Sequence, residues 1–150
     1  MLKTHLNLFV DTSVVFAAIL SKTGGARKLF RLGELGVVNI QAGPNVLREC
    51  EAVVRRKAPT TLPTLAILLE ACGLEQTPAP GSSDHERASA LVAYGPDAII
   101  LAEALTAGPD WFVTHDKAHF LKPKLDSQLP FRIGTPGDVI EFLGTYLTQL

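Results

Sequence analysis

The stretch FVDTSVVFAAIL, which runs from Phe9 to Leu20, predicts a buried strand, a tight turn and a helix, in that order. The apolar run Leu6–Val10 has the length of a strand and stops at an Asp-Thr-Ser cluster, after which residues 14–20 are apolar again. We therefore expect Asp11 at the carboxyl end of a strand, directly before a helix.

The same alternation of short apolar runs and helical patterns continues along the chain. Further strands are expected at 37–42, 111–114 and 131–133. Helices are expected at 26–35, from Pro44 through Val54, at 61–72, at 84–93, from Pro96 onward, and from 136 to about 147. Because strands separated by helices favour right-handed crossovers, we predict a three-layer α/β/α sandwich with a mostly parallel central sheet. The 150 residues are expected to form a single domain, residues 1–150.

The overall composition restricts how the chain can bind a polyanion. Apolar residues make up 47% and charged residues 19%, which is too apolar for a disordered or nucleic-acid-coating chain. The formal net charge is -1, so any contact with a polyanion must be local. Charged helix faces are usually just solvated, but a polyanion that binds this chain is expected to contact at least one of three basic clusters. These clusters are Arg27, Lys28 and Arg31, then Arg48, Arg55, Arg56 and Lys57, and then Lys117, Lys122 and Lys124.

The N-terminal segment and the cysteines bear on the compartment. The short run Leu6–Val10 is far shorter than a signal-peptide core or a membrane span of about 20 residues, so we expect a cytoplasmic protein without a membrane segment. Cys50 and Cys72 lie in mostly apolar surroundings, with no CxxC motif or Cys/His ladder. They are expected to be reduced thiols packed in or near the core.

Four acidic residues, distant along the chain, are expected to meet at one edge of the sheet. Asp11 and Asp116 each follow a strand, and the functional crevice of an open parallel sheet lies beyond the carboxyl ends of its strands. Asp97, in the first turn of one helix, and Glu49, within another, would add two more carboxylates. Four like charges repel one another without a cation, and oxygen ligands select Mg²⁺ or Mn²⁺ over zinc or copper. The pattern therefore predicts a divalent metal site.

Four stretches also carry a family resemblance: FVDTSVVFAAIL, PNVLRECEAVVRRK, PDAIILAEAL and WFVTHDKAHFL, in this order and with similar gaps. Through them, nearly the whole chain resembles the PIN-domain nucleases, a family that includes the VapC-like toxins of toxin–antitoxin pairs. The resemblance implies a metal-dependent endoribonuclease that hydrolyses RNA phosphodiester bonds with Mg²⁺ or Mn²⁺. It assigns the metal-binding and catalytic roles to Asp11, Glu49, Asp97 and Asp116, with Ser13 and Thr114 in supporting roles beside the first and last aspartate.

The chain departs from the family pattern at two positions. Several relatives carry another acid next to the third, where Pro96 precedes Asp97, and some carry an acid shortly after the fourth, where this chain has His119. These departures leave a one-metal and a two-metal site both open. Glu51 competes with Glu49 for the second acid, and the family spacing favours Glu49.

Each acid also has an ordinary structural interpretation. Asp11 and Asp97 suit helix N-termini, where aspartate is a common cap, and Glu49 or Asp116 taken singly would be a solvated surface acid. Their joint placement favours a shared site over four unrelated acids.

The two nearby histidines, His115 and His119, lack an HExxH context. We expect neutral, substrate-contacting or structural roles for both. A proton donor or phosphate contact at His119 is the alternative, because imidazole titrates near neutral pH.

Other function classes fit the sequence less well. The main alternative is an inactive PIN-like module that binds RNA or protein, and the presence of all four acids argues against it. A phospho-accepting receiver domain or a haloacid-dehalogenase-type phosphatase would need a further acid just after Asp11, where Thr12 and Ser13 stand. Neither GxGxxG nor GxxxxGKS/T occurs. If the chain is a toxin, an antitoxin protein would cover the acidic groove, and the apolar helices predict a homodimer.

Overall fold

The computed structural model describes residues 5–116 and 118–148. Within these residues one sheet has the strand order β3-β2-β1-β4-β5, and each neighbouring pair is parallel. The strands are β1 (Leu6–Val10), β2 (Val38–Ala42), β3 (Glu75–Gln76), β4 (Trp111–Val113) and β5 (Arg132–Gly134). The helices are α1 (Thr12–Leu20), α2 (Gly25–Glu34), α3 (Pro44–Lys57), α4 (Leu62–Ala71), α5 (Ser82–Leu91), α6 (Gly95–Ala107), α7 (Pro123–Asp126) and α8 (Pro136–Leu147), with a 3-10 turn at Pro59–Thr61.

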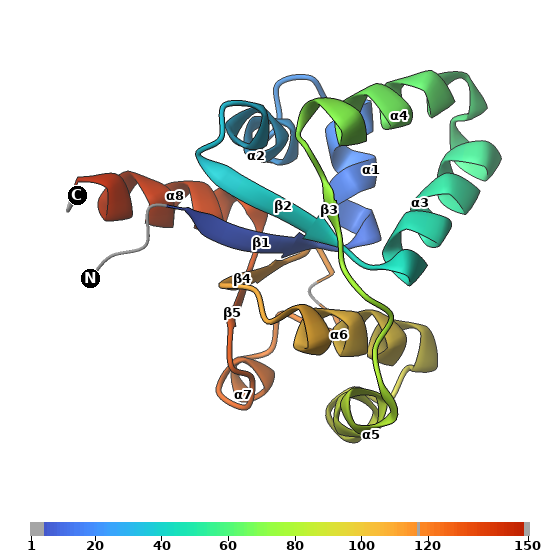
Figure 1. The fold of residues 1–150 in the computed structure, drawn as a ribbon, viewed down its shortest axis with the longest axis vertical. Helices are drawn as coiled ribbons and strands as arrows, with labels where there is room; N and C mark the ends of the chain where they lie inside the picture. The colour runs from blue at the N-terminus through green and yellow to red at the C-terminus, as the bar shows by residue number, and fades with distance from the viewer. Residues whose placement is uncertain (1–4, 117, 149–150) are drawn as a thin grey trace.

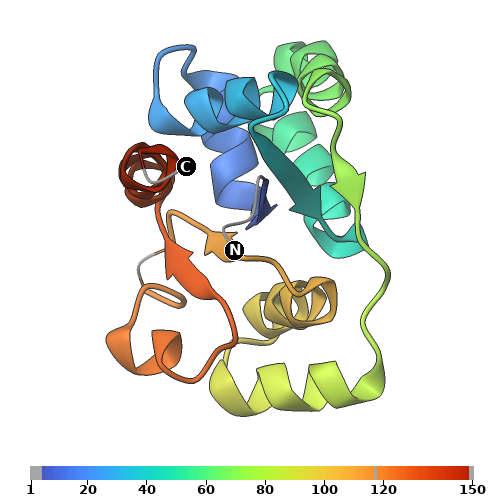
Figure 2. The same ribbon diagram turned by 60° about the vertical axis from the view of Figure 1, so that its left-hand side comes forward.

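Helices cover both faces of this sheet (Figures 1 and 2). On one face lie α1, α2, α3 and α4, and α8 packs against α2. On the other face α6 lies next to the sheet and α5 packs against α6. The predicted three-layer α/β/α fold with a mostly parallel central sheet is confirmed.

The central strand β1 determines where the sheet is most deeply buried. Its consecutive residues Leu8, Phe9 and Val10 are all fully buried, and successive side chains of a strand point to opposite faces. Leu8 is paired with Ile40 of β2 on one side and with Trp111 of β4 on the other. A strand with helices on both faces needs such a continuous apolar run. β1 therefore ends at the middle of the carboxyl edge of the sheet.

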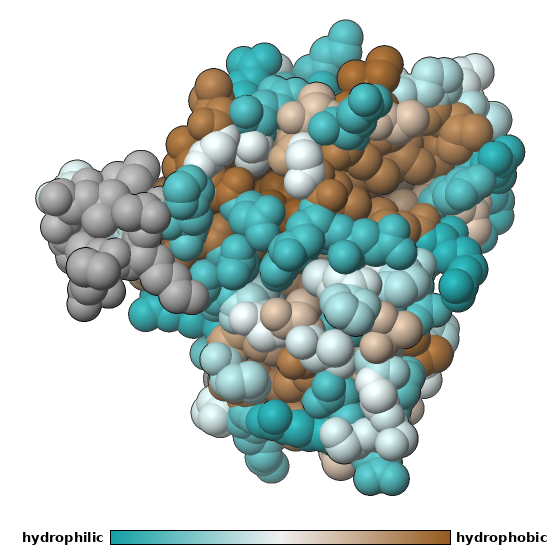
Figure 3. All heavy atoms as spheres, in the orientation of Figure 1, coloured by the Kyte–Doolittle hydropathy of each residue, from teal (hydrophilic) through white to brown (hydrophobic). Residues whose placement is uncertain are grey.

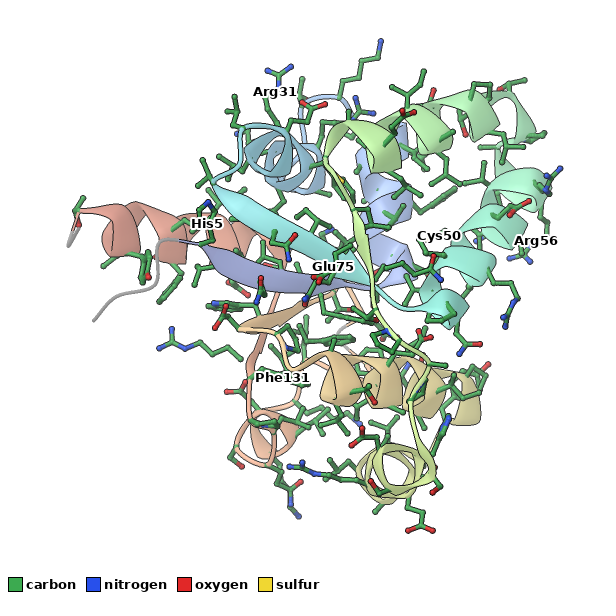
Figure 4. All side chains as sticks on the ribbon, in the orientation of Figure 1. His5, Arg31, Cys50, Arg56, Glu75 and Phe131 are labelled. Atoms are coloured by element: carbon green, nitrogen blue, oxygen red, sulfur yellow. The ribbon has the colours of Figure 1, made fainter. Side chains whose placement is uncertain are left out.

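Helix α3 follows β2 and turns one side toward the core. Pro44 occupies its first turn, where a missing N–H costs nothing. Val46, Cys50 and Val54 form its buried side, whereas Arg56 points away from the core (Figure 4). Cys50 and Cys72 are free and buried, as predicted, and burial raises the pKa of Cys50 to about 12.

The structure differs from the sequence-based prediction in its short elements. Strand β3 was not expected, because its two exposed residues show no apolar alternation. It is a strand only through its pairing with Gln41 and Ala42 of β2. The short helix α7 was also not expected, α5 begins two residues earlier than predicted, and β5 begins at Arg132 rather than Phe131.

Apolar side chains gather on the surface over α3 and α4, at the upper right of Figure 3. A groove of about 330 Å³ lies there, lined mostly by leucines: Leu47, Leu62, Leu65, Leu69 and Leu74. Across the part of the chain that the structure describes, no helix combines the length and the apolarity needed to cross a membrane.

Candidate active site

Asp11 lies directly after β1 and is the N-cap of α1, as its ordinary structural interpretation predicted. The residue is only 4% exposed. The Ser13 hydroxyl donates to Oδ1 at 2.5 Å, the Val14 amide donates to the same oxygen at 3.3 Å, and the Thr114 hydroxyl donates to Oδ2. Burial raises the pKa of Asp11 to about 6 against the opposing effect of these hydrogen bonds, and the negative charge of Asp116 adds to the rise.

The same hydroxyls tie the end of β1 to the end of β4. Thr114 is fully buried and accepts a hydrogen bond from the Asp116 amide at 2.9 Å while it donates to Asp11. Ser13 in turn accepts from the His115 amide at 3.0 Å. Two segments about a hundred residues apart in sequence are thereby joined by two small side chains. The family resemblance assigns supporting roles to Ser13 and Thr114, and in the structure both side chains contact Asp11 directly.

Two further aspartates, Asp97 and Asp116, lie beside the contact between the ends of β1 and β4. Asp97 in the first turn of α6 and Asp116 after β4 both approach His119, whose Nδ1 lies 2.9 Å from Oδ2 of each aspartate. One ligand atom from each of the three residues lies within 4.8 Å of the others. The hydrogen bond that Asp116 accepts is the main reason why the pKa of His119 is raised. The sequence-based expectation was a neutral His119, whereas a raised pKa favours the protonated ring.

Asp97 lacks the hydrogen bonds that hold Asp11. Its Oδ2 atom is buried and, among the described residues, receives no hydrogen bond from a hydroxyl or a backbone amide, so its polar contact is His119 Nδ1 at 2.9 Å. Burial is the main cause that raises the pKa of Asp97; the charge of His119 opposes the rise, and Asp116 and Glu49 add to it. Asp97 is thus a partly buried carboxylate, near other acids, whose Oδ2 is contacted by the His119 ring and not by the hydroxyl and amide donors that hold Asp11.

Glu49 lies on α3, across from the start of α6. Its side chain is exposed, and its charge acts on both Asp97 and Cys50. It is not among the three residues whose ligand atoms lie within 4.8 Å of one another. Glu51, the competing acid, pairs instead with Arg55 of its own helix at 2.8 Å. Of the two glutamates, Glu49 is therefore the one whose charge reaches the aspartates.

Sequence reasoning missed a buried carboxylate, Glu103. Glu103 is fully buried on α6 and accepts hydrogen bonds from the backbone amides of Asn45 at 2.7 Å and Val46 at 3.2 Å, in the first turn of α3. A Cβ atom on Gly43 would overlap with this carboxylate. Glu103 thus joins the helix that carries Asp97 to the helix that carries Glu49. The only signal in the sequence was a helix that opens with Gly43 and lacks a capping side chain.

Two members of the last basic cluster lie beside the acidic site. Lys122 and Lys124 line the same cavity as His119. Arg31, from the first cluster, lies at the outer surface of α2, on the face of the sheet opposite to α6 (Figure 4). Arg48 is one residue from Glu49 and donates to Asn45 at 2.9 Å. Lys117, the remaining member of the last cluster, lies outside the described residues.

The residues present fit a divalent cation. Burial, with a smaller contribution from neighbouring acids, raises the pKa values of Asp11 and Asp97, so a cation placed among them would stabilise their charged forms. The buried Oδ2 of Asp97 receives no hydroxyl or amide hydrogen bond from the described residues, and it lies with Asp116 and His119 in a group whose ligand atoms are within 4.8 Å of one another. Carboxylate oxygens suit Mg²⁺ or Mn²⁺, and His119 adds a nitrogen that the oxygen-only prediction did not include.

Comparisons with known proteins identify the fold. No protein-family model matches the chain, and no curated protein matches it. Among solved structures, it is similar to the DNA-bound VapBC of Salmonella typhimurium, with a TM-score of 0.65 and 16% identity over 87% of this chain and 98% of that one. It is similar to VapBC2 of Rickettsia felis bound to a promoter DNA fragment, with a TM-score of 0.62 and 15% identity over the same shares, 87% and 98%.

A third similar structure is PAE2754 from Pyrobaculum aerophilum, with a TM-score of 0.59 and 15% identity over 95% of this chain and 90% of that one. At these identities the similarity concerns the fold. In each case it extends over nearly the whole of both chains. The chain therefore has the fold of a VapC-like PIN domain.

Proposed function

We propose that this protein is a Mg²⁺- or Mn²⁺-dependent endoribonuclease that hydrolyses RNA phosphodiester bonds. The observation that carries the proposal is the convergence of Asp97, Asp116 and His119 within 4.8 Å, next to a buried Asp11 that both flanking hydroxyls orient. In support of it, Asp11 and Asp116 follow the parallel strands β1 and β4, and an open α/β fold binds its ligands beyond the carboxyl ends of its strands.

Each acid has a distinct part in this proposal. Asp97 and Asp116 hold the ion, and Asp11 contributes a carboxylate whose direction is fixed by Ser13 and Thr114. Glu49 adds negative charge from α3. A divalent ion bound here supplies an activated water and stabilises the charge that develops on the phosphate.

We propose single-stranded or looped RNA as the substrate. A narrow acidic site can accept only phosphates that leave a regular duplex, and unpaired RNA is the form that proteins usually recognise in detail. The basic residues Lys122 and Lys124 beside the acids offset the repulsion between the carboxylates and the RNA backbone.

We further propose that the protein acts in the cytoplasm as the toxin of a toxin–antitoxin pair and forms a homodimer. Two of the structurally similar proteins are VapBC assemblies. The leucine-lined groove between α3 and α4 offers an apolar surface for a protein contact. Growth arrest on induced expression, absent for Asp97→Asn, would support the toxin role, and light scattering at a dimer mass would support the dimer.

The decisive experiment is RNA cleavage by the purified protein. Transfer RNA and ribosomal RNA are incubated with protein and Mg²⁺, Mn²⁺ or EDTA, and products are separated on denaturing gels. We expect cleavage only with metal, and a loss of at least about a hundredfold in rate for Asp97→Asn and Asp116→Asn. Glu51→Gln, an exposed acid on α3 that pairs with Arg55, is the matched control and should cleave like wild type.

Two outcomes would contradict the proposal. Cleavage that persists in EDTA or in Asp97→Asn would exclude the metal mechanism. Metal-dependent RNA binding without any cleavage would favour the inactive RNA-binding module instead.

A further inference from the structure

A cavity of about 640 Å³ lies beside the acidic cluster and shares His119 with that cluster, but neither of its aspartates. Tyr94, His119, Lys122, Lys124 and Leu125 are among the residues that line it. It lies where the end of α5 and the short helix α7 come close together, at the bottom of Figure 2. Its volume falls within the range of small-ligand sites, roughly 300–1,000 Å³.

The cavity contains an exposed aromatic pair. The Tyr94 ring stacks on the His119 ring, with 5.4 Å between centroids and 18° between the planes. Tyr94 remains 55% exposed, although it is a large aromatic side chain. The other side of the pair reaches the acids, because His119 Nδ1 lies 2.9 Å from Asp97 and Asp116. The aromatic surface is therefore continuous with the proposed reaction site.

The charges around this pair change sign over a short distance. Lys122 and Lys124 are exposed and line the cavity, whereas the carboxylates of Asp97 and Asp116 lie on the far side of His119. A ligand that fits must carry a flat ring for the aromatic pair and negative charge for the lysines. A nucleotide has both features, whereas an acidic peptide would leave the stacked rings without a partner.

We propose that this cavity binds a nucleotide that flanks the scissile phosphate, with its base stacked on Tyr94 and its phosphate near Lys122 and Lys124. This inference rests on the proposed RNA substrate and adds to it a position for the neighbouring base. Stacking on an aromatic ring tolerates every base, so the cavity contributes affinity and positioning without requiring one sequence.

The test measures RNA binding in EDTA, so that metal-dependent cleavage does not consume the probe. The probe is a short, fluorescein-labelled, single-stranded oligoribonucleotide of mixed sequence, and fluorescence anisotropy gives its dissociation constant. We expect Tyr94→Ala to weaken binding at least about fivefold, as loss of one stacked base does. Tyr94→Phe keeps the ring and should bind like wild type.

Charge is tested separately from stacking. Lys122→Ala/Lys124→Ala should weaken binding and reduce the slope of log affinity against log salt by about 0.7, since each neutralised phosphate on single strands contributes about 0.7 and the proposal places one phosphate beside both lysines. The matched control is Lys28→Ala/Arg31→Ala, which removes two charges from α2 on the opposite layer. It should leave both the affinity and the slope near the wild-type values.

Folding and metal binding are checked for every variant by thermal unfolding and by Mn²⁺ affinity, which should be unchanged in Tyr94→Ala. The proposal is overturned if wild type shows no measurable RNA binding, if Tyr94→Ala binds like wild type, or if the α2 pair matters as much as the cavity pair. If the wild type cleaves RNA and Tyr94→Ala behaves identically, only the proposal of nucleotide binding in the cavity is contradicted. If the wild type binds RNA through the cavity but does not cleave it, only the proposed nuclease activity is contradicted.

Discussion

Two aspartates of the candidate site are held in different ways. Asp11 is buried at the end of β1, and hydrogen bonds from Ser13, Val14 and Thr114 fix both of its oxygens. Asp97 lies in the first turn of α6, and among the described residues its Oδ2 is contacted by His119 Nδ1 but receives no hydroxyl or amide hydrogen bond. Short contacts orient the first carboxylate, whereas the second depends on where a whole helix lies.

This difference separates two kinds of preorganisation. At Asp11 the local chain and one neighbouring strand supply the donors, so its direction is set once β1 and β4 pair. At Asp97 the position relative to Glu49 depends on how α6 meets α3, and the buried Glu103 carboxylate makes that contact. The orientation of Asp11, the inner acid, should therefore respond to changes in hydrogen bonding. The positions of Asp97 and Glu49, the outer acids, should respond to changes in helix packing.

The largest effect that we expect is a gain in stability on Asp11→Asn. With a pKa of about 6 in the folded protein and 3.8 when solvated, Asp11 takes up a proton on folding between these pH values. Folding stability from this group is therefore highest below about pH 4 and falls as pH rises through 6. Because Asn carries no charge, the metal-free variant should be more stable at pH 8 by up to about 3 kcal/mol.

Urea unfolding in EDTA at pH 5 and pH 8 measures this gain, which should shrink at the lower pH. Asp84→Asn is the control, since Asp84 is less buried and also accepts a hydroxyl hydrogen bond, from Thr106 at 2.6 Å. It should give little gain. A gain for Asp11→Asn that is equal at both pH values would contradict the assigned cause.

A substitution at Gly43 tests the helix contact that places the outer acids. The added Cβ of Gly43→Ala would overlap with the Glu103 carboxylate, so either this carboxylate leaves the α3 amides that it accepts from, or α3 or α6 shifts. We expect a loss of about 2 kcal/mol in unfolding free energy together with weaker Mn²⁺ binding. Gly81→Ala is the matched control, because Gly81 caps α5 with a similar backbone conformation and an added Cβ there meets nothing within 4 Å.

If both glycine variants lose the same stability, the loss reflects the N-cap position and not the Glu103 contact. If Gly43→Ala is destabilised but binds Mn²⁺ like wild type, Glu103 supports the fold without positioning the acids.

The sequence was sufficient for the parts of the fold that have strong periodicity. The apolar runs that became β1, β2 and β4 are long enough to be recognised, and Asp11 directly follows one of them. Strand β3 could not be predicted, since its two exposed residues become a strand only by pairing with β2. Local patterns predict elements that bury their own side chains, and they miss those that depend on a partner.

The same limit applies to the site. The sequence predicted which ends of strands and helices carry Asp11, Asp97 and Asp116, and the spacing of three residues from Asp116 to His119 was visible. It could not show that His119 turns its ring between the two aspartates. Nor could it show that Glu103 points to α3, because a glutamate in the middle of an apolar helix does not reveal its partner.

A smaller loss of metal binding and cleavage is expected when the Thr114 hydrogen bonds to Asp11 and to the Asp116 amide are removed without a change in charge. Thr114→Val keeps the shape of a fully buried side chain but removes the hydroxyl between Asp11 and the Asp116 amide. We expect Mn²⁺ affinity and RNA cleavage to fall about tenfold, as for other residues that orient metal ligands. Thr77→Val is the matched control, since Thr77 is also buried and no group in the described residues bonds to its hydroxyl. Isothermal titration with Mn²⁺ compares the two variants, and equal affinities would contradict an orienting role for Thr114.

The smallest effect separates the two glutamates of α3. Glu49 raises the pKa of Asp97 through its charge, whereas Glu51 pairs with Arg55 on the exposed side of the helix. Glu49→Gln should therefore weaken Mn²⁺ binding several-fold, because a partly screened charge at the edge of a site contributes little more than about 1 kcal/mol. Glu51→Gln removes the same charge two residues away and should change Mn²⁺ affinity and unfolding free energy very little. Equal losses for both variants would mean that general charge on α3, and not the position of Glu49, attracts the ion, and the second acid of the site would have to be sought elsewhere.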